Sequence, residues 1–363
     1  MRVGLDATPL LGARTGVGRY TYSLLTALAE GAALAEGADQ RDELVATAFT
    51  LRGRRELGPV LPADVRQRSR PAPARALQEA WARSEWPPVE LLTGRLDVFH
   101  ATNFVLPPTR SARGVVTIHD LSYLRQPDTV AAASSRYRAL VPRSLARACV
   151  VVTPSTAVAE QVREEYAIDV PVVVTPLGVG PAWFAATPPD AALRQRLGLP
   201  AAYLLFVGTL EPRKDLPTLL AAHALVRGAP PLVLVGPAGW GARPDLRGCI
   251  TPGYLADGPL RSLVAGAAAL VLPSRAEGFG LPVLEALAAG TPVVASDLAV
   301  LREVGGPMVT YARTGSPEAF AAALTAVLET PGDRGSRQAW AAPFTWQRCA
   351  ELTRGAYALA LRR

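Results

Sequence analysis

Two acidic residues and two glycines occur close together in the second half of the sequence. Glu277 and Glu285 are eight positions apart, and Gly278 and Gly280 come just after the first of them. Carboxylates accept hydrogen bonds from paired hydroxyl groups, such as those of a sugar or a ribose. Glycines have no side chain, so their backbone N–H groups can approach a ligand closely. The combination predicts a site for a hydroxyl-rich ligand, because a simple helix cap would explain only one of the two glutamates.

The residues around these glutamates predict a strand, a loop and a helix. The apolar run Ala269–Pro273 is typical of a buried strand. Leu281 and Pro282 can begin a helix, and Gly290 can end it. Both glutamates then lie near the carboxyl end of a strand, which is where open α/β sheets bind ligands.

Two adjacent cations, Arg213 and Lys214, form a second candidate site. They lie between a predicted strand, Tyr203–Gly208, and a helix predicted to begin near Leu216. Backbone N–H groups at a helix start, the helix dipole and two cations together attract an anion such as phosphate. Lys214 is also the only lysine of the chain, which favours a role for a compact ammonium group. A basic loop that is merely solvated is the alternative, since adjacent basic residues are common.

Length and composition predict a two-domain globular protein. The chain has 363 residues, more than one hydrophobic core usually organises, and 49% of them are hydrophobic against 19% charged. The start does not resemble a signal peptide, and no apolar run reaches the ~18 residues that a membrane-spanning helix needs. We therefore expect a soluble cytoplasmic protein. The three cysteines and three histidines are widely separated, so no metal site is predicted.

Alternating apolar runs and helical segments predict two Rossmann-like α/β halves, each a parallel sheet wound with helices. The first half starts with a strand at Arg2–Asp6, a glycine-containing loop, and a helix from about Arg19 to Ala29. The Pro- and Arg-rich stretch Leu51–Glu90 predicts irregular surface structure, and Thr175–Pro189 predicts an interdomain linker. Further strands are expected at Leu44–Phe49, Val98–His100, Gly114–Ile118, Cys149–Thr153, Leu232–Gly236 and Pro292–Ala295, and a last helix within Phe344–Arg363.

Gly208–Leu216 together with Glu277–Gly290 resemble the signature of the retaining glycosyltransferases of family 4. The resemblance covers nearly the whole chain and implies the GT-B fold of two facing Rossmann-like domains. It places an acceptor domain at residues 1–180 and a nucleotide-sugar donor domain at 181–343. Residues 344–363 are then a helix that returns to the N-terminal domain.

The resemblance also implies roles for individual residues. Arg213 and Lys214 hold the diphosphate and stabilise the leaving group, and Glu277 holds sugar hydroxyls together with the N–H groups that follow it. Glu285 takes the ribose hydroxyls. The catalytic residues are expected to be His119, Arg213, Lys214 and Glu277. The donor-binding residues are expected to be Gly16, Gly18, Gly208, Thr209, Arg213, Lys214, Tyr254, Leu255, Glu277, Gly278, Phe279, Gly280, Leu281 and Glu285.

Two segments of the first half fit the same family, and one residue of the second half departs from it. Gly16-Val17-Gly18 resembles the family's glycine-rich loop, and its distance from the first strand argues against a dinucleotide fingerprint. His119 with Asp120 resembles a pair that faces the donor sugar, where the histidine would orient the sugar rather than act as a base. Many members have an arginine where this chain has Thr209, so the phosphate role rests on the two cations further on.

The resemblance implies a metal-independent, retaining hexosyltransferase with no separate cofactor, in which protein cations stabilise the departing nucleotide diphosphate. The segments around Lys214 and His119 look most like bacterial mannosyltransferases, which favours GDP-mannose over UDP-glucose as the donor. Two alternatives stay open. One is a UDP-glucose-dependent glucosyltransferase, and the other is a sugar-nucleotide 2-epimerase of the same fold.

The acceptor is not specified by any motif: it is a small molecule, a glycan or a lipid-linked molecule. The arginines of Leu51–Arg75 are not interleaved with aromatic residues, so nucleic-acid binding is not predicted. We expect these arginines to lie on a solvated face of the protein. A basic patch on a membrane surface is the alternative, and it would place the enzyme at the inner face of the membrane, near a lipid-linked acceptor.

Overall fold

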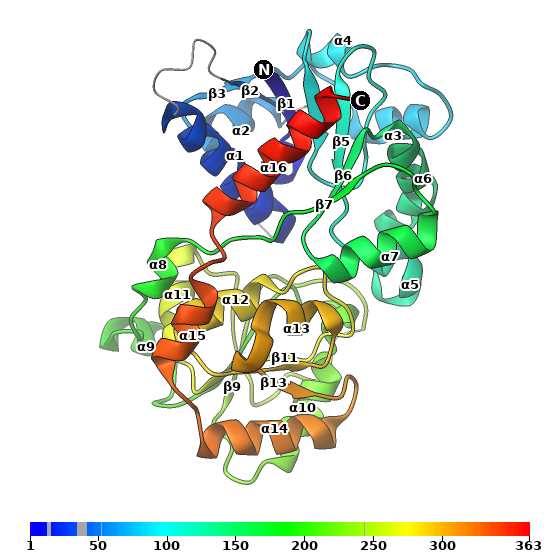
Figure 1. Ribbon diagram of the computed structural model, residues 1–363. Helices are drawn as coiled ribbons and strands as arrows, with labels where there is room; N and C mark the ends of the chain where they lie inside the picture. The colour runs from blue at the N-terminus through cyan, green and yellow to red at the C-terminus, as the bar shows by residue number, and fades with distance from the viewer. Residues whose placement is uncertain (13–15, 35–41, 52, 243) are drawn as a thin grey trace. The chain divides into compact units, whose positions relative to one another are not determined.

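The computed structural model describes residues 1–12, 16–34, 42–51, 53–242 and 244–363, which form two compact units (Figure 1). The N-terminal unit contains Met1–Leu121, Ala133–Gly178 and Trp346–Arg363, and the C-terminal unit contains Ser122–Ala132 and Val179–Thr345. The expected ranges 1–180, 181–343 and 344–363 did not include the excursion of residues 122–132 into the second unit. The last segment of the chain belongs to the N-terminal unit.

The N-terminal unit is built on a seven-stranded sheet in the order β3-β2-β1-β4-β5-β6-β7, with every pairing parallel. Its central strands are buried along nearly their whole length, which explains why they appear in the sequence as short apolar runs. The chain order reverses between β1 and β4, which makes this pair the switch point of the sheet. The strands are β1 (Arg2–Asp6), β2 (Glu43–Thr47), β3 (Val65–Gln67), β4 (Val98–Ala101), β5 (Arg113–Thr117), β6 (Val150–Thr153) and β7 (Val172–Val174).

Helices cover the N-terminal sheet, and the C-terminal helix is one of them. Figure 1 shows α16 (Trp346–Leu361) beside α1 (Gly16–Leu34). A buried chain of hydrogen bonds ties α16 to the sheet: Tyr357 Oη lies 2.8 Å from His100 Nδ1, whose Nε2 lies 2.7 Å from Thr117 Oγ1. The other helices of this unit are α2 (Arg54–Leu57), α3 (Ala74–Trp81), α4 (Glu90–Thr93), α6 (Tyr137–Arg147) and α7 (Thr156–Tyr166), with 3-10 turns at Thr8–Leu10 and Gly58–Val60.

The C-terminal unit repeats the design with six parallel strands in the order β10-β9-β8-β11-β12-β13. Here the chain order reverses between β8 and β11. The strands are β8 (Leu204–Val207), β9 (Leu232–Val235), β10 (Ile250–Gly253), β11 (Ala269–Leu272), β12 (Val293–Ser296) and β13 (Thr310–Ala312). The helices are α8 (Pro181–Phe184), α9 (Ala191–Leu197), α10 (Leu216–Leu225), α11 (Asp257–Gly266), α12 (Leu281–Ala288), α13 (Ala299–Gly305), α14 (Pro317–Glu329) and α15 (Arg334–Ala341), with 3-10 turns at Pro212–Lys214 and Gly306–Met308.

Residues 122–132 carry the short helix α5 (Ser122–Arg125) and a 3-10 turn at Pro127–Thr129, before a 3-10 turn at Ala132–Arg136. Two hydrogen bonds join this segment to the rest of the C-terminal unit. Gln126 Nε2 donates to the carbonyl of Arg275 over 3.1 Å, and Trp240 Nε1 donates to the carbonyl of Thr129 over 3.1 Å. The segment belongs to the second unit.

Three expectations from the sequence need correction. The prediction that Leu51–Glu90 is irregular is wrong, because the segment contains the edge strand β3 and the helix α3. The helix expected from Arg19 begins at Gly16, so Gly16 and Gly18 lie in the first turn of α1 rather than in a loop. The expected linker Thr175–Pro189 contains the helix α8.

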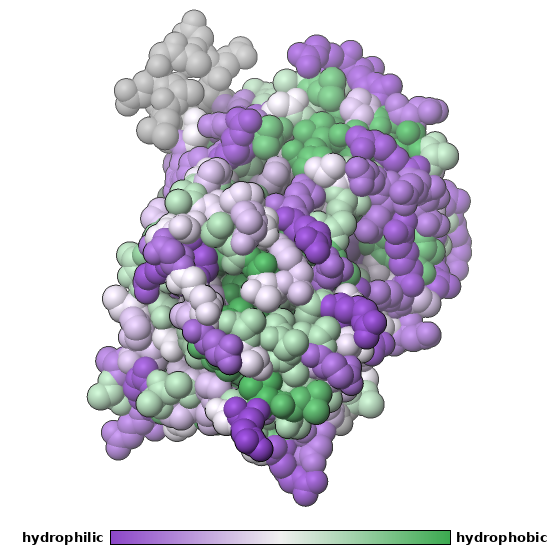
Figure 2. Space-filling model, turned by 60° about the horizontal axis from the view of Figure 1, so that its bottom comes forward, coloured by the Kyte–Doolittle hydropathy of each residue, from purple (hydrophilic) through white to green (hydrophobic). Residues whose placement is uncertain are grey.

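Among the described residues, no helix is both long and apolar enough to cross a membrane. On the face drawn in Figure 2, hydrophilic and apolar side chains are interspersed. Three arginines of the basic stretch, Arg66, Arg68 and Arg70, are exposed, and Arg66 pairs with Glu43 at 3.1 Å. This ion pair fits the solvated face that the sequence favours for these arginines.

Candidate functional site

The predicted phosphate-binding and sugar-binding residues meet at the switch point of the C-terminal sheet. Lys214 lies in the turn after β8, and Glu277 lies in the loop after β11. The two strands are parallel neighbours, with Leu204 opposite Ala269. Because carboxyl ends of parallel strands meet at one edge, residues 63 positions apart in the sequence come into direct contact. Ligands of open α/β sheets bind at this kind of edge.

Glu277 holds both cations of the candidate site. Lys214 Nζ donates to Glu277 Oε1 over 2.6 Å, and Arg213 Nη1 donates to Glu277 Oε2 over 3.3 Å. Arg213 also donates to the backbone carbonyl of Ala276 and to Glu211 Oε1, each over 2.6 Å. The Glu277 and Lys214 side chains are only 7% and 9% exposed. The turn after β8 and the loop after β11 are therefore joined by a buried ionic cluster.

The charges of this cluster balance one another. Burial would raise the pKa of Glu277, but the charges of Lys214 and Arg213 outweigh it and lower that pKa to about 2. Glu277 is therefore ionised at neutral pH. Glu211 supplies a second carboxylate, with a side chain only 6% exposed. The two cations predicted to bind a diphosphate are thus compensated by two carboxylates, and Lys214 keeps further N–H donors on its ammonium group.

A second ion pair beside the cluster was not predicted from the sequence. Arg275 Nε lies 3.0 Å from Asp215 Oδ2, and Thr218 Oγ1 donates to the same carboxylate over 2.9 Å. Asp215 is buried in the left-handed conformation at φ 49°, where it connects the 3-10 turn to α10. No local spacing records the pair of Asp215 and Arg275, which are 60 positions apart in the sequence. The pair positions the segment that carries Lys214.

Glycines allow the loops of this site to approach closely. A Cβ added to Gly236, after β9, would lie 2.0 Å from the carbonyl oxygen of Gly208, after β8. Thr209, the departure from the family pattern, lies in the loop after β8, and its Cγ2 would be 3.0 Å from a Cβ added to Gly239 in the loop after β9. The backbones of the two loops are in contact, so a residue larger than glycine at position 236 or 239 would clash with the loop that carries Thr209.

The loop after β11 leads directly into α12. Gly280 has φ 92°, a conformation that favours glycine, and a Cβ there would lie 2.5 Å from Leu301 Cδ2. Leu281 is the first residue of α12, as the sequence predicts, and Glu285 is buried within this helix. Phe279 is buried against Phe344, with ring centroids 6.3 Å apart. Gly278, between Glu277 and Phe279 in the sequence, is half-buried.

Tyr254 and Leu255, two of the expected donor-binding residues, follow β10 at the edge of the same sheet. Tyr254 is 51% exposed, and Leu255 is half-buried. Gly253, the last residue of β10, has φ 76° and accepts a hydrogen bond from the N–H of Gly236 over 2.9 Å. Tyr254 therefore follows a strand end connected to the loops of the ionic cluster, and an exposed ring in this position is available to a ligand.

The remaining predicted residues belong to the N-terminal unit. His119 follows β5 and is buried, and its Nε2 lies 2.8 Å from the carbonyl oxygen of Thr102, to which it donates. Burial lowers the pKa of His119, so the imidazole is neutral. Tyr20 packs edge-on against the ring at 4.9 Å. Gly16 has open space where a Cβ would lie, and Gly18 is buried. The roles predicted for these residues toward the donor stay predictions.

Two α/β units, each built on a parallel sheet, are the architecture of the GT-B fold. A protein of Anabaena solved in complex with UDP-glucose has this fold and superimposes with a TM-score of 0.70. It is 18% identical to this chain, and the match covers 98% of this chain and 99% of that one.

The family follows from the sequence comparisons. Residues 14–183 match the model described as Glycosyltransferase Family 4, and residues 201–330 match the model described as Glycosyl transferases group 1. O-antigen chain mannosyltransferase B of Escherichia coli is 30% identical over 99% of this chain and 100% of its own length. D-inositol 3-phosphate glycosyltransferase of Kineococcus radiotolerans is 37% identical over 51% of each chain. The chain belongs to glycosyltransferase family 4 and is a hexosyltransferase, which decides against the 2-epimerase alternative.

Proposed function

We propose that this enzyme transfers mannose from GDP-mannose to an acceptor hydroxyl with retention of anomeric configuration. The observation that carries the proposal is the contact of Lys214 and Arg213 with Glu277 at the switch point of the C-terminal sheet. Two cations at this edge suit a nucleotide diphosphate, and the carboxylate between them suits sugar hydroxyls. Similarity to a full-length mannosyltransferase supports mannose over glucose.

In the proposed reaction, the bond between the sugar C1 and the diphosphate oxygen breaks while the acceptor oxygen bonds to C1 on the same face. The acceptor proton passes to the leaving diphosphate. Arg213 and Lys214 stabilise the charge that develops on this leaving group, which is the role a divalent metal serves in other transferases. Chelation by EDTA should therefore leave the transfer rate unchanged.

The donor is tested by thermal denaturation with GDP, UDP, ADP and their sugars. A ligand at 100 times its dissociation constant stabilises the native state by ~2.7 kcal/mol, so the preferred donor is the one that raises the melting temperature most. We expect GDP-mannose to rank first, and a leading UDP-glucose would assign a glucosyltransferase instead. Stabilisation by none of them would remove the donor-site proposal.

The stereochemical course is tested by proton NMR of the first product formed. The α-linked sugar of GDP-mannose should appear as an α-linked product, because attack and departure share one face. A β-linked product would show inversion and would contradict the proposed reaction.

A further inference from the structure

The segment Ser122–Ala132, here called the strap, belongs to the C-terminal unit, although the residues on both sides of it belong to the N-terminal unit. The strap is internally hydrogen-bonded. The N–H of Gln126 donates to the carbonyl of Ser122 over 2.9 Å, and Thr129 donates to the carbonyl of Gln126 through its N–H over 3.0 Å and its hydroxyl over 2.8 Å. The strap therefore presents ordered groups to the rest of its unit, and none of them was predicted as a site residue.

Gln126 of the strap bonds to the loop after β11. Its Nε2 donates to the carbonyl of Arg275 over 3.1 Å. The backbone N–H of Arg275 donates in turn to the carbonyl of Arg213 over 2.9 Å, and Arg213 Nη1 donates to the carbonyl of Ala276 over 2.6 Å. Gln126 therefore bonds to the same residue whose backbone holds the backbone of Arg213.

Thr129 of the strap bonds to the loop after β9. Its carbonyl accepts a hydrogen bond from Trp240 Nε1 over 3.1 Å, and Trp240 is 38% exposed. A Cβ added to Gly241, the next residue, would lie 2.5 Å from Pro212 Cγ. The loop that carries Trp240 is thus in contact with the first residue of the turn Pro212–Lys214.

The strap is therefore hydrogen-bonded to two loops that both contact the turn carrying Arg213 and Lys214. Stabilisation of a developing charge requires cations that are already in place before the reaction begins. A displacement of about 1 Å in a catalytic group can lower a rate ~100-fold. Two loops that are held by one ordered segment restrict such displacements of the turn.

Both strap contacts are made by neutral side chains to backbone carbonyls. Removing them leaves every charge of the ionic cluster in place, so their effect on position can be separated from an effect on charge. Gln126 Oε1 is buried and has no hydrogen-bond partner within the described part of the chain. Loss of the Gln126 amide therefore removes one hydrogen bond together with one unsatisfied acceptor, and the two effects on stability oppose each other.

We propose that Gln126 and Trp240 are positioning residues for the transfer reaction: through the strap they hold the two loops around the turn Pro212–Lys214 and so fix Arg213 and Lys214 against the leaving diphosphate. The inference rests on the proposed function, because it gives the strap an effect on the departure of a nucleotide diphosphate. A bound diphosphate can adapt to displaced cations, whereas the charge of the transition state develops at fixed atoms. Loosening the strap should therefore lower kcat more than it raises KM.

The first test is hydrogen–deuterium exchange of the full chain without any ligand, which does not depend on the identity of the donor. Gln126→Met removes the amide donor at similar length, and Trp240→Phe removes the indole N–H but keeps an aromatic ring. Each variant should raise the exchange rate of the amides of residues 208–216 by about threefold or more and leave α14 unchanged. Gln195→Met and Trp86→Phe, the same exchanges at exposed positions, should change neither segment.

The second test is the release of GDP from GDP-mannose to water, which needs no knowledge of the acceptor. Gln126→Met and Trp240→Phe should each lower kcat about tenfold and keep KM within about twofold of the wild type. Their melting temperatures should stay within about 3 °C of the wild type. The two control variants should have wild-type kinetics.

Unchanged exchange of residues 208–216 in either variant would overturn the inference, and so would an unchanged kcat. Faster exchange in α14 as well, or a raised KM at constant kcat, would indicate general loosening of the unit and would overturn it too. Absence of GDP release by the wild-type enzyme would count against the proposed donor, and the exchange result alone would then decide on the strap. The two proposals therefore fail separately.

Discussion

Glu277→Gln should strongly destabilise the ligand-free C-terminal unit. The substitution keeps the shape of the side chain but removes the charge that Lys214 and Arg213 face at 2.6 and 3.3 Å. The pKa of Glu277 is lowered from 4.5 to about 2, and at ~1.4 kcal/mol per pKa unit this corresponds to ~3 kcal/mol of stability at neutral pH. The melting temperature of a unit of this size changes by ~2–4 °C per kcal/mol, so a fall of roughly 6–12 °C is expected.

The pH dependence has a defined direction. The folded pKa of Glu277 lies below the unfolded value, so its contribution is present above pH 4.5 and is lost as the pH falls from 4.5 toward 2. Differential scanning calorimetry of wild type and variant from pH 7 to pH 3 should show two curves that converge toward acid pH. Glu329→Gln changes an exposed carboxylate and should stay within ~0.5 kcal/mol of wild type. A decrease in melting temperature of less than about 2 °C at pH 7 would refute the reasoning, as would parallel pH curves for wild type and Glu277→Gln.

Three other measurements test the remaining groups. Lys214→Ala should lower the rate of transfer by ~10²–10³, measured as release of nucleotide in the presence of acceptor, whereas a near-normal rate would remove Lys214 from leaving-group stabilisation. Glu285→Gln should weaken GDP in calorimetric titrations but leave inorganic pyrophosphate binding unchanged, since its proposed partner is the ribose; equal loss of both ligands would contradict that role. Burial lowers the pKa of His100 to about 3, so this group alone should cost the N-terminal unit ~2 kcal/mol as the pH falls from 6.5 to 5, and His100→Gln should remove that contribution from the pH dependence of urea unfolding. His119, whose pKa is also lowered, acts in the same direction, and Asp6, whose pKa is raised to about 6, acts in the opposite one. Both groups are present in wild type and variant, so an unchanged pH dependence in His100→Gln would be the contrary result.

The predictable part of the fold is the part encoded locally. Central strands such as β8 and β11 are buried along their length and therefore show as apolar runs. The start of α12 at Leu281 follows from the glycine and proline around it. The edge strand β3 was missed because only Val65 of its three residues is buried, while the other two face solvent. Such a strand is defined by its pairing with β2, which the local sequence does not record.

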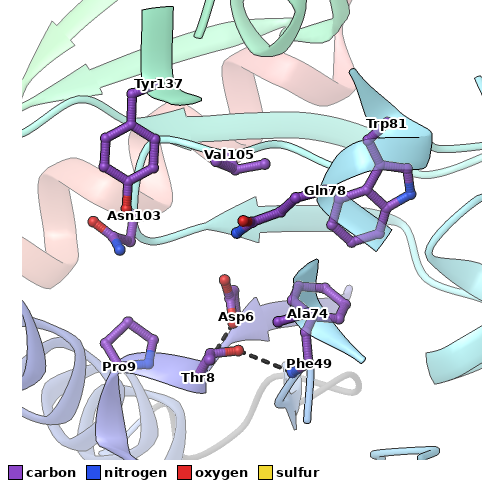
Figure 3. A pocket seen from close by; sticks show the side chains of 10 residues that line it. All are labelled: Asp6, Thr8, Pro9, Phe49, Ala74, Gln78, Trp81, Asn103, Val105 and Tyr137. Atoms are coloured by element: carbon purple, nitrogen blue, oxygen red, sulfur yellow. Dashed lines mark hydrogen bonds between the residues drawn. The ribbon is translucent and has the colours of Figure 1, made fainter. Parts of the chain in front are cut away.

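The candidate site was predictable in its residue types but not in its charge balance. Glu277 and Lys214 were predicted to bind different parts of a ligand, and the structure joins them in one ion pair. That contact depends on the adjacency of β8 and β11, which is a property of the sheet order. A pocket at the carboxyl ends of β1, β2 and β4 in the N-terminal unit was not predicted, for the same reason (Figure 3). Asp6, Gln78, Asn103 and Tyr137 are scattered along the sequence, and none of them forms a motif with its neighbours.

The two sheets use the same topological position with opposite electrostatics. At the switch point of the C-terminal sheet, two cations are held by buried carboxylates, and an incoming diphosphate can exchange with those carboxylates without leaving a cation buried alone. At the switch point of the N-terminal sheet, a buried carboxyl group faces amides, and among the described residues that line the pocket there is no Arg or Lys. An anion is therefore disfavoured at the second position and favoured at the first.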